Sequence, residues 1–244
     1  MNPRALGMLS AVLFASAVST AWAAEAADAI PTSAGDLGIT FVGHGSLLFA
    51  WGGKVIHVDP WSKLADYGQL PAADLILITH GHGDHLDSAA IEAVRKPGTE
   101  ILVSRAAADR VPGSRVLANG ETATVQGVKV EAVPAYNLVH MRSAGVPYHP
   151  KGEGNGYVLT SGDTRVYVAG DTENIPEMEN LGDIAVAFLP MNLPYTMTPE
   201  MAAAAARAVH PKILYPYHFG ETDPAELVKL LGGSGIEVRV RAMK

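Results

Sequence analysis

The chain has 244 residues, 48% of them hydrophobic, and a formal charge of −7 with no cysteine. That length and composition allow a full hydrophobic core without disulfides, and the missing cysteines exclude thiolate ligands at any metal site. Because the chain is acidic and its lysines and arginines are not clustered, it is a poor candidate for a nucleic-acid-binding protein.

The first 23 residues have the pattern of a secretory signal peptide. Residues 1–4 carry a positive charge, residues 5–18 are almost wholly apolar, and Ala21-Trp22-Ala23 places small residues at the two positions that a signal peptidase recognises. An uncleaved N-terminal anchor is the alternative, although the apolar core is short for a membrane span. We therefore predict an exported protein, located in a bacterial periplasm and cleaved near Ala23, with no other membrane segment.

Residues 24–36 are rich in alanine and predict a flexible lead-in to one domain over residues 37–244. The first half of this domain contains short runs of β-branched and aromatic residues that are typical of strands. These predicted strands cover residues 39–42, 46–51, 54–58, 74–78 and 101–104. Gly52-Gly53 predicts a two-residue hairpin turn, and a helix is predicted from Asp87 or Ser88 to a stop before Pro97.

The second half of the domain combines the same kinds of element. Further strands are predicted over residues 121–125, 128–133, 156–160, 165–169, 183–189, 213–217 and 236–240. Thr198, Pro199 and Glu200 form a typical helix N-terminus, and a last helix begins at Asp223. Two β-rich blocks, each followed by helices, predict two sheets packed face to face with helices outside.

The most informative stretch is residues 79–85, Thr-His-Gly-His-Gly-Asp-His, which directly follows the apolar run 74–78. It places three imidazoles and a carboxylate on the loop that leaves a buried strand, where functional residues usually lie. Imidazole and carboxylate together suit Zn²⁺, Mn²⁺ or Fe²⁺, and one short loop can divide them between two adjacent ions. The alternative is that three histidines lie on a surface loop by chance. Packing of the chain gives no reason for these residue types at this spacing, which argues against that alternative.

Two further strand ends carry candidate ligands. Asp171 follows the apolar strand 165–169 and one glycine, and His218 ends the strand 213–217. Either residue alone is as typical of a helix N-cap or of a hydrogen-bonded polar group as of a metal ligand. Together with the loop at 79–85, they predict a metal site built from separate parts of the chain.

The order of these motifs resembles the metallo-β-lactamase superfamily. The His-x-His-x-Asp-His signature of residues 80–85, the later Gly-Asp at 170–171 and His218 carry the resemblance, which covers residues 37–244. Three shorter motifs, Gly43-His44-Gly45-Ser46, Asp59-Pro60-Trp61 and Ala169-Gly170-Asp171-Thr172, are similar to a branch of metal-dependent hydrolases related to L-ascorbate-6-phosphate lactonase. The resemblance implies an α/β fold, a four-layer αββα sandwich with two metal ions at one rim.

The resemblance also implies how the ligands divide between the two ions. The expected ligands are His80 and His82 for the first ion, Asp84, His85 and His218 for the second, and Asp171 as a bridge. The ions are expected to be zinc, with manganese or iron(II) as alternatives. Asp84 is also the candidate catalytic residue, since it can move a proton to the leaving group.

One expected ligand of the first ion is missing from its usual place. The superfamily has a third histidine after the strand 128–133, where this chain has Asn137. Asn137 could bind through its amide oxygen, which suits Mn²⁺ or Mg²⁺ better than zinc. His149 and His140 are the other replacements, and we favour His149, although a loop histidine bonded to backbone is its structural alternative.

Other polar residues have supporting roles in this prediction. His44 and Asp59 lie at turns expected to face the same rim and are predicted to contact the ligands from outside, with Asp59 fixing the ring of a ligand histidine. As a turn residue before Pro60, Asp59 also has a purely structural explanation. His57 in mid-strand and His210 at a helix end are predicted to be structural.

These observations predict an exported binuclear metal-dependent hydrolase, in which a metal-bound hydroxide attacks a lactone, ester, amide or phosphodiester. Its expected partner is a small-molecule substrate, held by Lys151 or Arg142 and by Tyr195. We expect no nucleic-acid partner and no membrane contact beyond the export signal. The oligomeric state stays open. A non-catalytic metal- or ligand-binding domain on the same scaffold is the main alternative, which Asn137 favours. An iron-dependent oxidoreductase and a β-lactamase proper are further alternatives.

Overall fold

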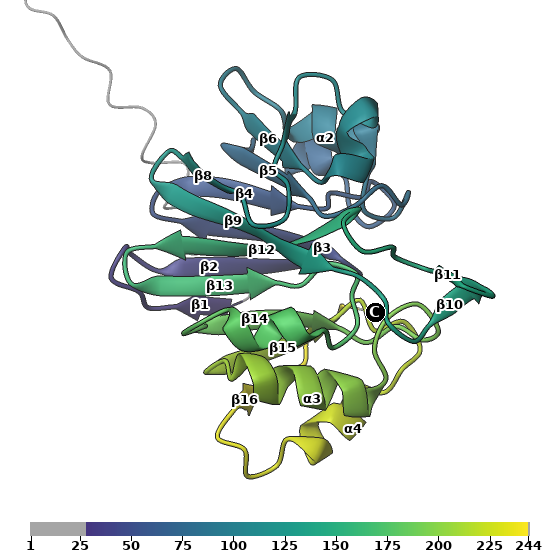
Figure 1. Cartoon of the computed structure of the whole chain (residues 1–244). Helices are drawn as coiled ribbons and strands as arrows, with labels where there is room; N and C mark the ends of the chain where they lie inside the picture. The colour runs from purple at the N-terminus through teal and green to yellow at the C-terminus, as the bar shows by residue number, and fades with distance from the viewer. Residues whose placement is uncertain (1–27, 244) are drawn as a thin grey trace, which may run out of the picture.

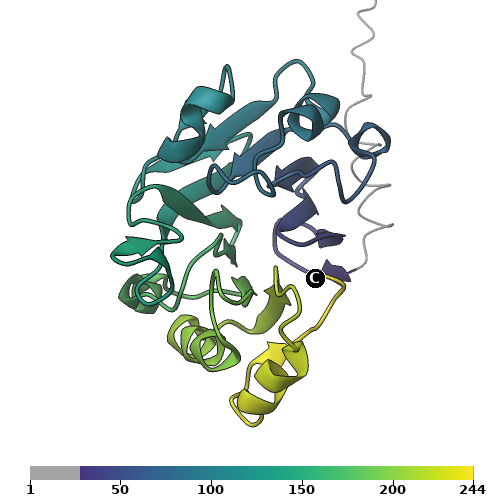
Figure 2. The ribbon, with the colours of Figure 1, turned by 90° about the vertical axis from the view of Figure 1, so that its right-hand side faces the viewer.

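The computed structural model describes residues 28–243, and the signal peptide predicted for residues 1–23 lies outside them. Two seven-stranded sheets lie face to face, and helices cover the outer face of each (Figures 1 and 2). This arrangement confirms the predicted mixed α/β sandwich. No helix within residues 28–243 has the length and hydrophobicity that a bilayer crossing requires.

The first sheet keeps the order of the sequence. Its strands are β1 (Asp28–Ile30), β2 (Leu37–Gly43), β3 (Ser46–Trp51), β4 (Lys54–Val58), β5 (Leu75–Ile78), β6 (Glu100–Val103) and β7 (Arg115–Val116). Neighbours from β1 to β4 are antiparallel, and neighbours from β4 to β7 are parallel. In β5, the leucines pack between the two sheets and the isoleucines pack against α2 (Ser88–Val94). Burial of this strand on both faces explains its unbroken apolar run.

The second sheet has the spatial order β16-β15-β14-β13-β12-β9-β8. Its strands are β8 (Thr122–Val125), β9 (Val128–Ala135), β12 (Gly154–Ser161), β13 (Thr164–Val168), β14 (Val186–Pro190), β15 (Ile213–Tyr217) and β16 (Glu237–Val238). β8, β9, β12 and β13 pair antiparallel, whereas β13 to β16 pair parallel. A separate hairpin of β10 (Met141–Ser143) and β11 (Val146–Pro147) projects beyond the sandwich (Figure 1).

The three described α-helices begin where the sequence predicts, whereas the sequence analysis did not predict the 3-10 helices. The described helices are α2, α3 (Pro199–Val209), α4 (Pro224–Leu230) and the 3-10 helices η1 (Tyr67–Gln69), η2 (Arg105–Arg110) and η3 (Pro176–Asn180). The side chains of Asp87, Thr198 and Asp223 cap the three α-helices by accepting hydrogen bonds from first-turn amides. The small alanine side chains on the buried face of α3 let this helix pack closely on the second sheet.

The segment predicted to be a flexible lead-in is ordered from residue 28 onward, which corrects that prediction. β1 pairs antiparallel with β2. The buried carboxylate of Asp28 accepts a hydrogen bond from Tyr215 Oη at 2.5 Å and two from Arg241, at 2.9 Å from Nε and 2.8 Å from Nη2. These contacts tie the start of the described chain to its end, and the local composition carries no sign of them.

Parallel pairing directs several loops to one edge of the sandwich. The carboxyl ends of parallel neighbours meet at the same edge of a sheet, and loops beyond such ends commonly carry binding sites. The loops that follow β4, β5, β13 and β15 carry Asp59, residues 79–85, Asp171 and His218. The topology therefore gathers residues from four distant parts of the sequence.

Candidate metal centre

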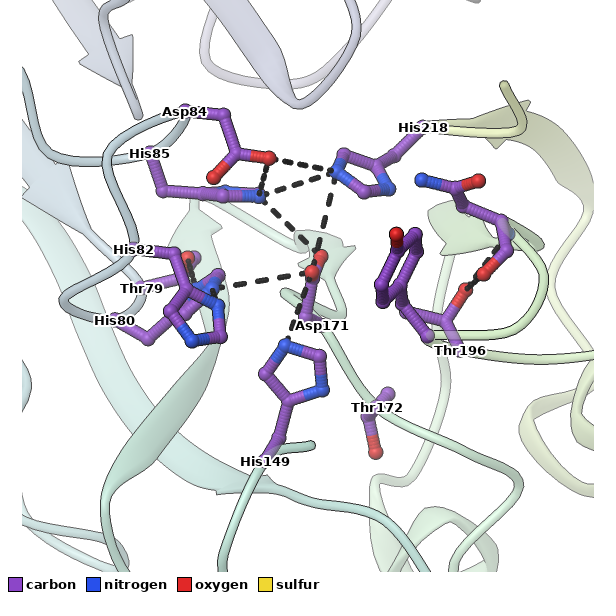
Figure 3. Close-up of polar contacts among 12 residues, drawn as sticks. Thr79, His80, His82, Asp84, His85, His149, Asp171, Thr172, Thr196 and His218 are labelled. Atoms are coloured by element: carbon purple, nitrogen blue, oxygen red, sulfur yellow. Dashed lines mark hydrogen bonds and ion pairs between the residues drawn. The ribbon is translucent and has the colours of Figure 1, made fainter. Parts of the chain in front are cut away.

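Two groups of candidate ligand atoms lie side by side at this edge (Figure 3). The first group is formed by His80, His82, His149 and Asp171, and the second by His44, Asp84, His85 and His218. Within each group, one nitrogen or oxygen per residue lies within 4.8 Å of all the others. All seven ligands predicted from the sequence are thus brought together, together with His44.

Asp171 lies between the two groups. Figure 3 shows its carboxylate facing imidazoles from both sides. Its Oδ2 is 3.3 Å from His149 Nε2 and 3.8 Å from His80 Nε2, while its Oδ1 is 3.5 Å from His85 Nε2. His218 Nε2 lies 3.9 Å from Oδ2. A carboxylate in this position can offer one oxygen to each of two cations.

The residue before Asp171 has to be glycine. Gly170 has a φ of +66°, and a Cβ placed there would lie 2.5 Å from the carbonyl oxygen of Asn155. Any other residue would displace the neighbouring strand and, with it, the direction in which Asp171 points. The Gly-Asp pair noted in the sequence therefore has a steric reason.

Three residues of the centre adopt left-handed backbone conformations. His44, Asp59 and His218 have φ values of +50°, +44° and +47° and make up three of the five non-glycine residues with positive φ in the described chain. Each such residue costs on the order of 1–3 kcal/mol, and this cost persists only where the surroundings hold the backbone in place. One such contact is the bond from His218 N to His44 O at 3.0 Å.

Asp59 orients His85, as the sequence predicts for a carboxylate behind a ligand. Its buried Oδ2 accepts a hydrogen bond from His85 Nδ1 at 2.8 Å and another from Thr79 Oγ1 at 2.6 Å, while Oδ1 accepts from Thr79 N at 2.8 Å. With its proton on Nδ1, the imidazole presents the lone pair of Nε2 to the centre of the site.

Asn137 performs the same task for His149. Its Oδ1 accepts hydrogen bonds from His149 Nδ1 at 2.6 Å and from His149 N at 2.9 Å. Its Nδ2 donates to Glu173 Oε1 at 3.0 Å and to Tyr195 O at 2.9 Å. The amide is thus fully used inside the protein, and His149 Nε2 is the atom that faces the site. Asn137 is a positioning residue rather than the alternative ligand considered from the sequence.

Glu173 is a residue that the sequence analysis missed. Its buried side chain accepts hydrogen bonds from the backbone amides of Leu138, Val139 and His140, each at 2.7 Å. His140 Nδ1 also lies 2.7 Å from Oε1, so this histidine is engaged away from the two ligand groups. Glu173 directly follows Asp171-Thr172 in the sequence, and this closeness to a predicted ligand was the one available signal.

His44 lies nearer to the centre than predicted. Its Nε2 is 3.1 Å from Asp84 Oδ2, and its ring lies 3.8 Å from the ring of His218, centroid to centroid. The prediction that His44 contacts the ligands only from outside is corrected, because its nitrogen belongs to the second ligand group itself. The next residue of this turn, Gly45, cannot be replaced by a larger residue without a shift, since a Cβ there would lie 2.7 Å from His85 Cε1.

The carboxylates of Asp171 and Asp84 are ionised at neutral pH. Burial raises the pKa of Asp171, but His218 and His85 outweigh it and hold this pKa well below its ordinary value. Burial likewise raises the pKa of Asp84, but the neighbouring His218, His44 and His85 together outweigh burial and lower this pKa. Ionised carboxylates are the form that binds cations.

Three imidazoles of the centre, those of His80, His82 and His218, are neutral at pH 7. Burial lowers the pKa values of His80, His82 and His218. His85 differs: burial lowers its pKa, but the carboxylates of Asp171 and Asp59 outweigh burial and raise it to about 9. The excess of negative charge around His85 is the charge that a cation would balance.

The residues fit divalent cations. Asp171 Oδ1 is buried and has no hydrogen-bond partner among the described residues. An unpaired buried carboxylate oxygen is costly, and a metal ion satisfies it. The donor set of imidazoles and carboxylates, without thiolates, suits Zn²⁺, Mn²⁺ and Fe²⁺.

Two cavities open onto the ligands. One, of about 300 Å³, reaches the first group and is also lined by Arg142, Val146 and Tyr148. The other, of about 440 Å³, reaches the second group and is also lined by Arg142, Tyr148 and Tyr195. Arg142 Nη2 donates to His82 Nε2 at 3.2 Å. Of the residues predicted to hold substrate, Arg142 and Tyr195 therefore lie at the site.

The predicted substrate contact of Lys151 is corrected. Lys151 Nζ lies 2.7 Å from Glu177 Oε1 and 3.2 Å from Tyr136 Oη, and it lines neither cavity. The ion pair holds the ammonium group away from the ligands. Sequence position alone, two residues after His149, could not show this direction.

Comparison with known proteins identifies the family. Residues 38–218 match the family model described as a beta-lactamase superfamily domain. A UPF0173 metal-dependent hydrolase of Thermococcus kodakarensis is 34% identical over 214 residues, which cover 80% of this chain and 92% of the relative. The chain belongs to this family of metal-dependent hydrolases, within the metallo-β-lactamase superfamily. Membership confirms the superfamily predicted from the sequence.

Solved structures related to this metal-dependent hydrolase share its fold. A protein of Parabacteroides distasonis, assigned as a metal-dependent hydrolase, is 51% identical with a TM-score of 0.85, and the match covers 89% of this chain and 98% of that one. Igni18, a metallo hydrolase of Ignicoccus hospitalis, is 27% identical with a TM-score of 0.69, covering 84% and 94%. The family resemblance thus extends over nearly the whole described chain.

Proposed function

We propose that this metal-dependent hydrolase holds two divalent cations side by side and hydrolyses a lactone, ester or phosphodiester. The observation that carries the proposal is the position of Asp171, whose oxygens lie within 4 Å of histidine nitrogens from both ligand groups. The first group would hold one cation and the second group the other, with Asp171 shared. When bound, such cations supply Lewis-acid activation of a water molecule and of the electrophilic group of the substrate.

Asp84 is the residue proposed to hold the transferred proton. Its side chain is 36% exposed, whereas those of His85 and His218 are at most 2% exposed. Its Oδ2 lies 3.1 Å from His44 Nε2, and the residue lines the larger cavity. An ionised carboxylate that borders the substrate cavity can accept a proton and return it to the leaving group.

A lactone or phosphoester is the substrate type that we favour. The motifs around His44, Asp59 and Asp171 resemble the branch related to L-ascorbate-6-phosphate lactonase. The guanidinium of Arg142 borders both cavities, and a planar cation of this kind suits a phosphate or carboxylate.

We further propose zinc as the resident ion and the periplasm as the location. The many imidazoles of the donor set support zinc, and the signal-peptide pattern of residues 1–23 supports export. Cell fractionation with N-terminal sequencing tests the location. A mature protein that begins near Ala24 in the periplasmic fraction is expected, and a cytoplasmic protein that begins at Met1 would contradict it.

The decisive experiment measures metal content and hydrolysis on the same preparation. Protein offered Zn²⁺ or Mn²⁺ should bind about two ions per chain and hydrolyse at least one of three probes: γ-butyrolactone, p-nitrophenyl acetate or bis(p-nitrophenyl) phosphate. One ion with full turnover would reject the paired-ion proposal. Two ions without turnover of any probe would favour the non-catalytic binding domain instead.

A further inference from the structure

We propose that the rim of the metal centre binds the aliphatic chain of an amphiphilic substrate, while Arg142 binds its anionic head. The proposal rests on the proposed hydrolase function for the bond that is cleaved, but the binding it describes can be measured without turnover. It narrows the substrate class to acyl or alkyl compounds that carry an acidic group close to the scissile bond.

Exposed apolar side chains gather around the metal centre. Nine large hydrophobic residues in the described chain are markedly exposed, and six of them lie on two loops beside the ligands. These six are Leu138, Val139, Met141, Val146, Leu193 and Tyr195. Val139 is 67% exposed and Val146 48%. Apolar groups concentrated in this way mark a binding surface, whereas single exposed hydrophobic residues are normal.

The two loops form one continuous surface. The rings of Tyr148 and Tyr195 pack edge to face with centroids 5.0 Å apart. Asn137 Nδ2 donates to Tyr195 O at 2.9 Å, which joins the loops at a second point. Glu173 in turn holds the amides of residues 138–140. The apolar side chains therefore stand on a segment that is fixed to the sandwich.

Val146 connects this surface to the smaller cavity. The wall of that cavity contains Val146, Pro147 and Pro150, and its inner end contains the ligands His80 and His149. A ligand chain that leaves the metal centre along this cavity would meet Pro150 and the apolar side chains of β11. The geometry therefore suits a substrate with a polar reacting end and an aliphatic tail.

Arg142 supplies the charge that such a head group needs. It lines both cavities and lies 3.2 Å from His82. No carboxylate among residues 28–243 forms an ion pair with it. A guanidinium beside the ligands without an acidic partner favours an anion. A membrane-binding face would instead be rich in lysine and arginine, and Arg142 is the only such residue in segments 137–149 and 192–196.

The test measures the affinity of the zinc-loaded protein for ethyl, butyl, hexyl and octyl phosphate by calorimetry, below the micelle concentration of each. A fully buried methylene group strengthens binding about fourfold, so partial burial of six added methylenes should make octyl phosphate bind at least about tenfold more tightly than ethyl phosphate. An affinity that does not depend on chain length would overturn the proposal. Failure to hydrolyse any ester would leave this result intact and would reject only the proposed reaction.

Matched valine variants test where the aliphatic chain of the ligand binds. The double variant Val139→Ser/Val146→Ser should lose most of the chain-length dependence. The control variant Val228→Ser/Val240→Ser changes valines that are 43% and 39% exposed outside these loops and should keep it. Equal slopes in the two double variants would overturn the assignment of the tail to the rim.

Arg142→Gln separates head from tail. This variant should weaken all four alkyl phosphates by a similar factor and leave the chain-length dependence unchanged. Unchanged affinity for every phosphate would overturn the role of Arg142. Two further outcomes, each without any effect of chain length on affinity, would also overturn the proposal. In one, the protein sediments with phosphatidylglycerol vesicles and Val139→Ser/Val146→Ser abolishes this. In the other, the protein is a dimer in solution and the same double variant dissociates it.

Discussion

The loop at residues 80–85 and the loop at residues 137–149 face the same metal centre but are built differently. In the first, six consecutive residues supply four ligand side chains, and a turn closed by bonds from His85 N and Leu86 N to His82 O holds them together. In the second, a longer loop supplies His149 alone, whose ring is held by Asn137. One arrangement is local in sequence, and the other depends on contacts between distant segments.

In this chain, the loop at residues 137–149 contributes to the first ligand group through His149 and not through Asn137. Asn137 stands where the superfamily expects a histidine, and His149 reaches the same ligand group from twelve positions later in the chain. The side chain at position 137 then becomes free to orient the new ligand through its amide oxygen.

The largest effect is expected at Asp171, which faces both loops. Asp171→Asn removes the shared negative charge, so both cations should be weakened and kcat/KM should fall by more than ~10²-fold, the upper range seen for residues behind metal ligands. Metal analysis and steady-state kinetics check this. Without metal, the variant should be less stable than the metal-free wild type at neutral pH, because it loses the ionised carboxylate that interacts with His218 and His85. A variant that keeps one tightly bound ion would show that the loops bind independently.

The next prediction compares the two orienting residues. Asp59→Asn should weaken the cation at the second ligand group, and Asn137→Ala the cation at the first, each by about tenfold to a hundredfold. A competitive chelator titration that resolves two steps measures this. His140→Ala is the matched control, since its ring lies on the same loop but outside both ligand groups. Loss of both ions from either variant would mean that the groups are strongly coupled.

The pH dependence of stability should separate a buried histidine outside the centre from one inside it. Burial lowers the pKa of His57 to about 4, although its Nε2 donates to Pro71 O. In the unfolded chain, the His57 imidazole is protonated below about pH 6.5, whereas in the folded protein it stays neutral down to about pH 4. Folding stability therefore falls by on the order of 3 kcal/mol as the pH drops from about 6.5 to 4. Urea unfolding across this range checks it, and His57→Gln, which keeps a donor, should flatten the curve.

In the metal-free protein, His85 should act in the opposite direction. Burial lowers its pKa, but Asp171 and Asp59 raise it to about 9, so its stabilising charge is present below pH 6.5 and is lost as the pH rises towards 9. Bound cations would replace this proton, so the folding stability of the metal-loaded protein should not fall as the pH rises towards 9. An equal alkaline slope with and without metal would contradict that interpretation.

The smallest effect is expected at Lys151. Its ammonium pairs with Glu177 outside the cavities and is largely exposed, so Lys151→Ala should leave the stability almost unchanged and KM within about twofold. Arg142→Ala, in the loop that borders both cavities, should raise KM for anionic substrates. If Lys151→Ala raised KM more than Arg142→Ala did, Lys151 and not Arg142 would be the substrate-binding residue.

The sandwich and the ligand loop at residues 80–85 could be predicted from the order of residues alone. Apolar runs mark the strands, cap residues mark the helix starts, and residues 80–85 carry their spacing in consecutive positions. Such features depend on neighbours in the chain, so a pattern of residues is enough to predict them.

Four features required the folded structure: His149 and not Asn137 facing the site, the inner position of His44, the buried role of Glu173 and the direction of Lys151. Each depends on which side chain a loop turns inward, and that is settled by hydrogen bonds between segments tens of residues apart. The same reason explains β1, whose place is set by Asp28 contacting Tyr215 and Arg241 at the other end of the described chain.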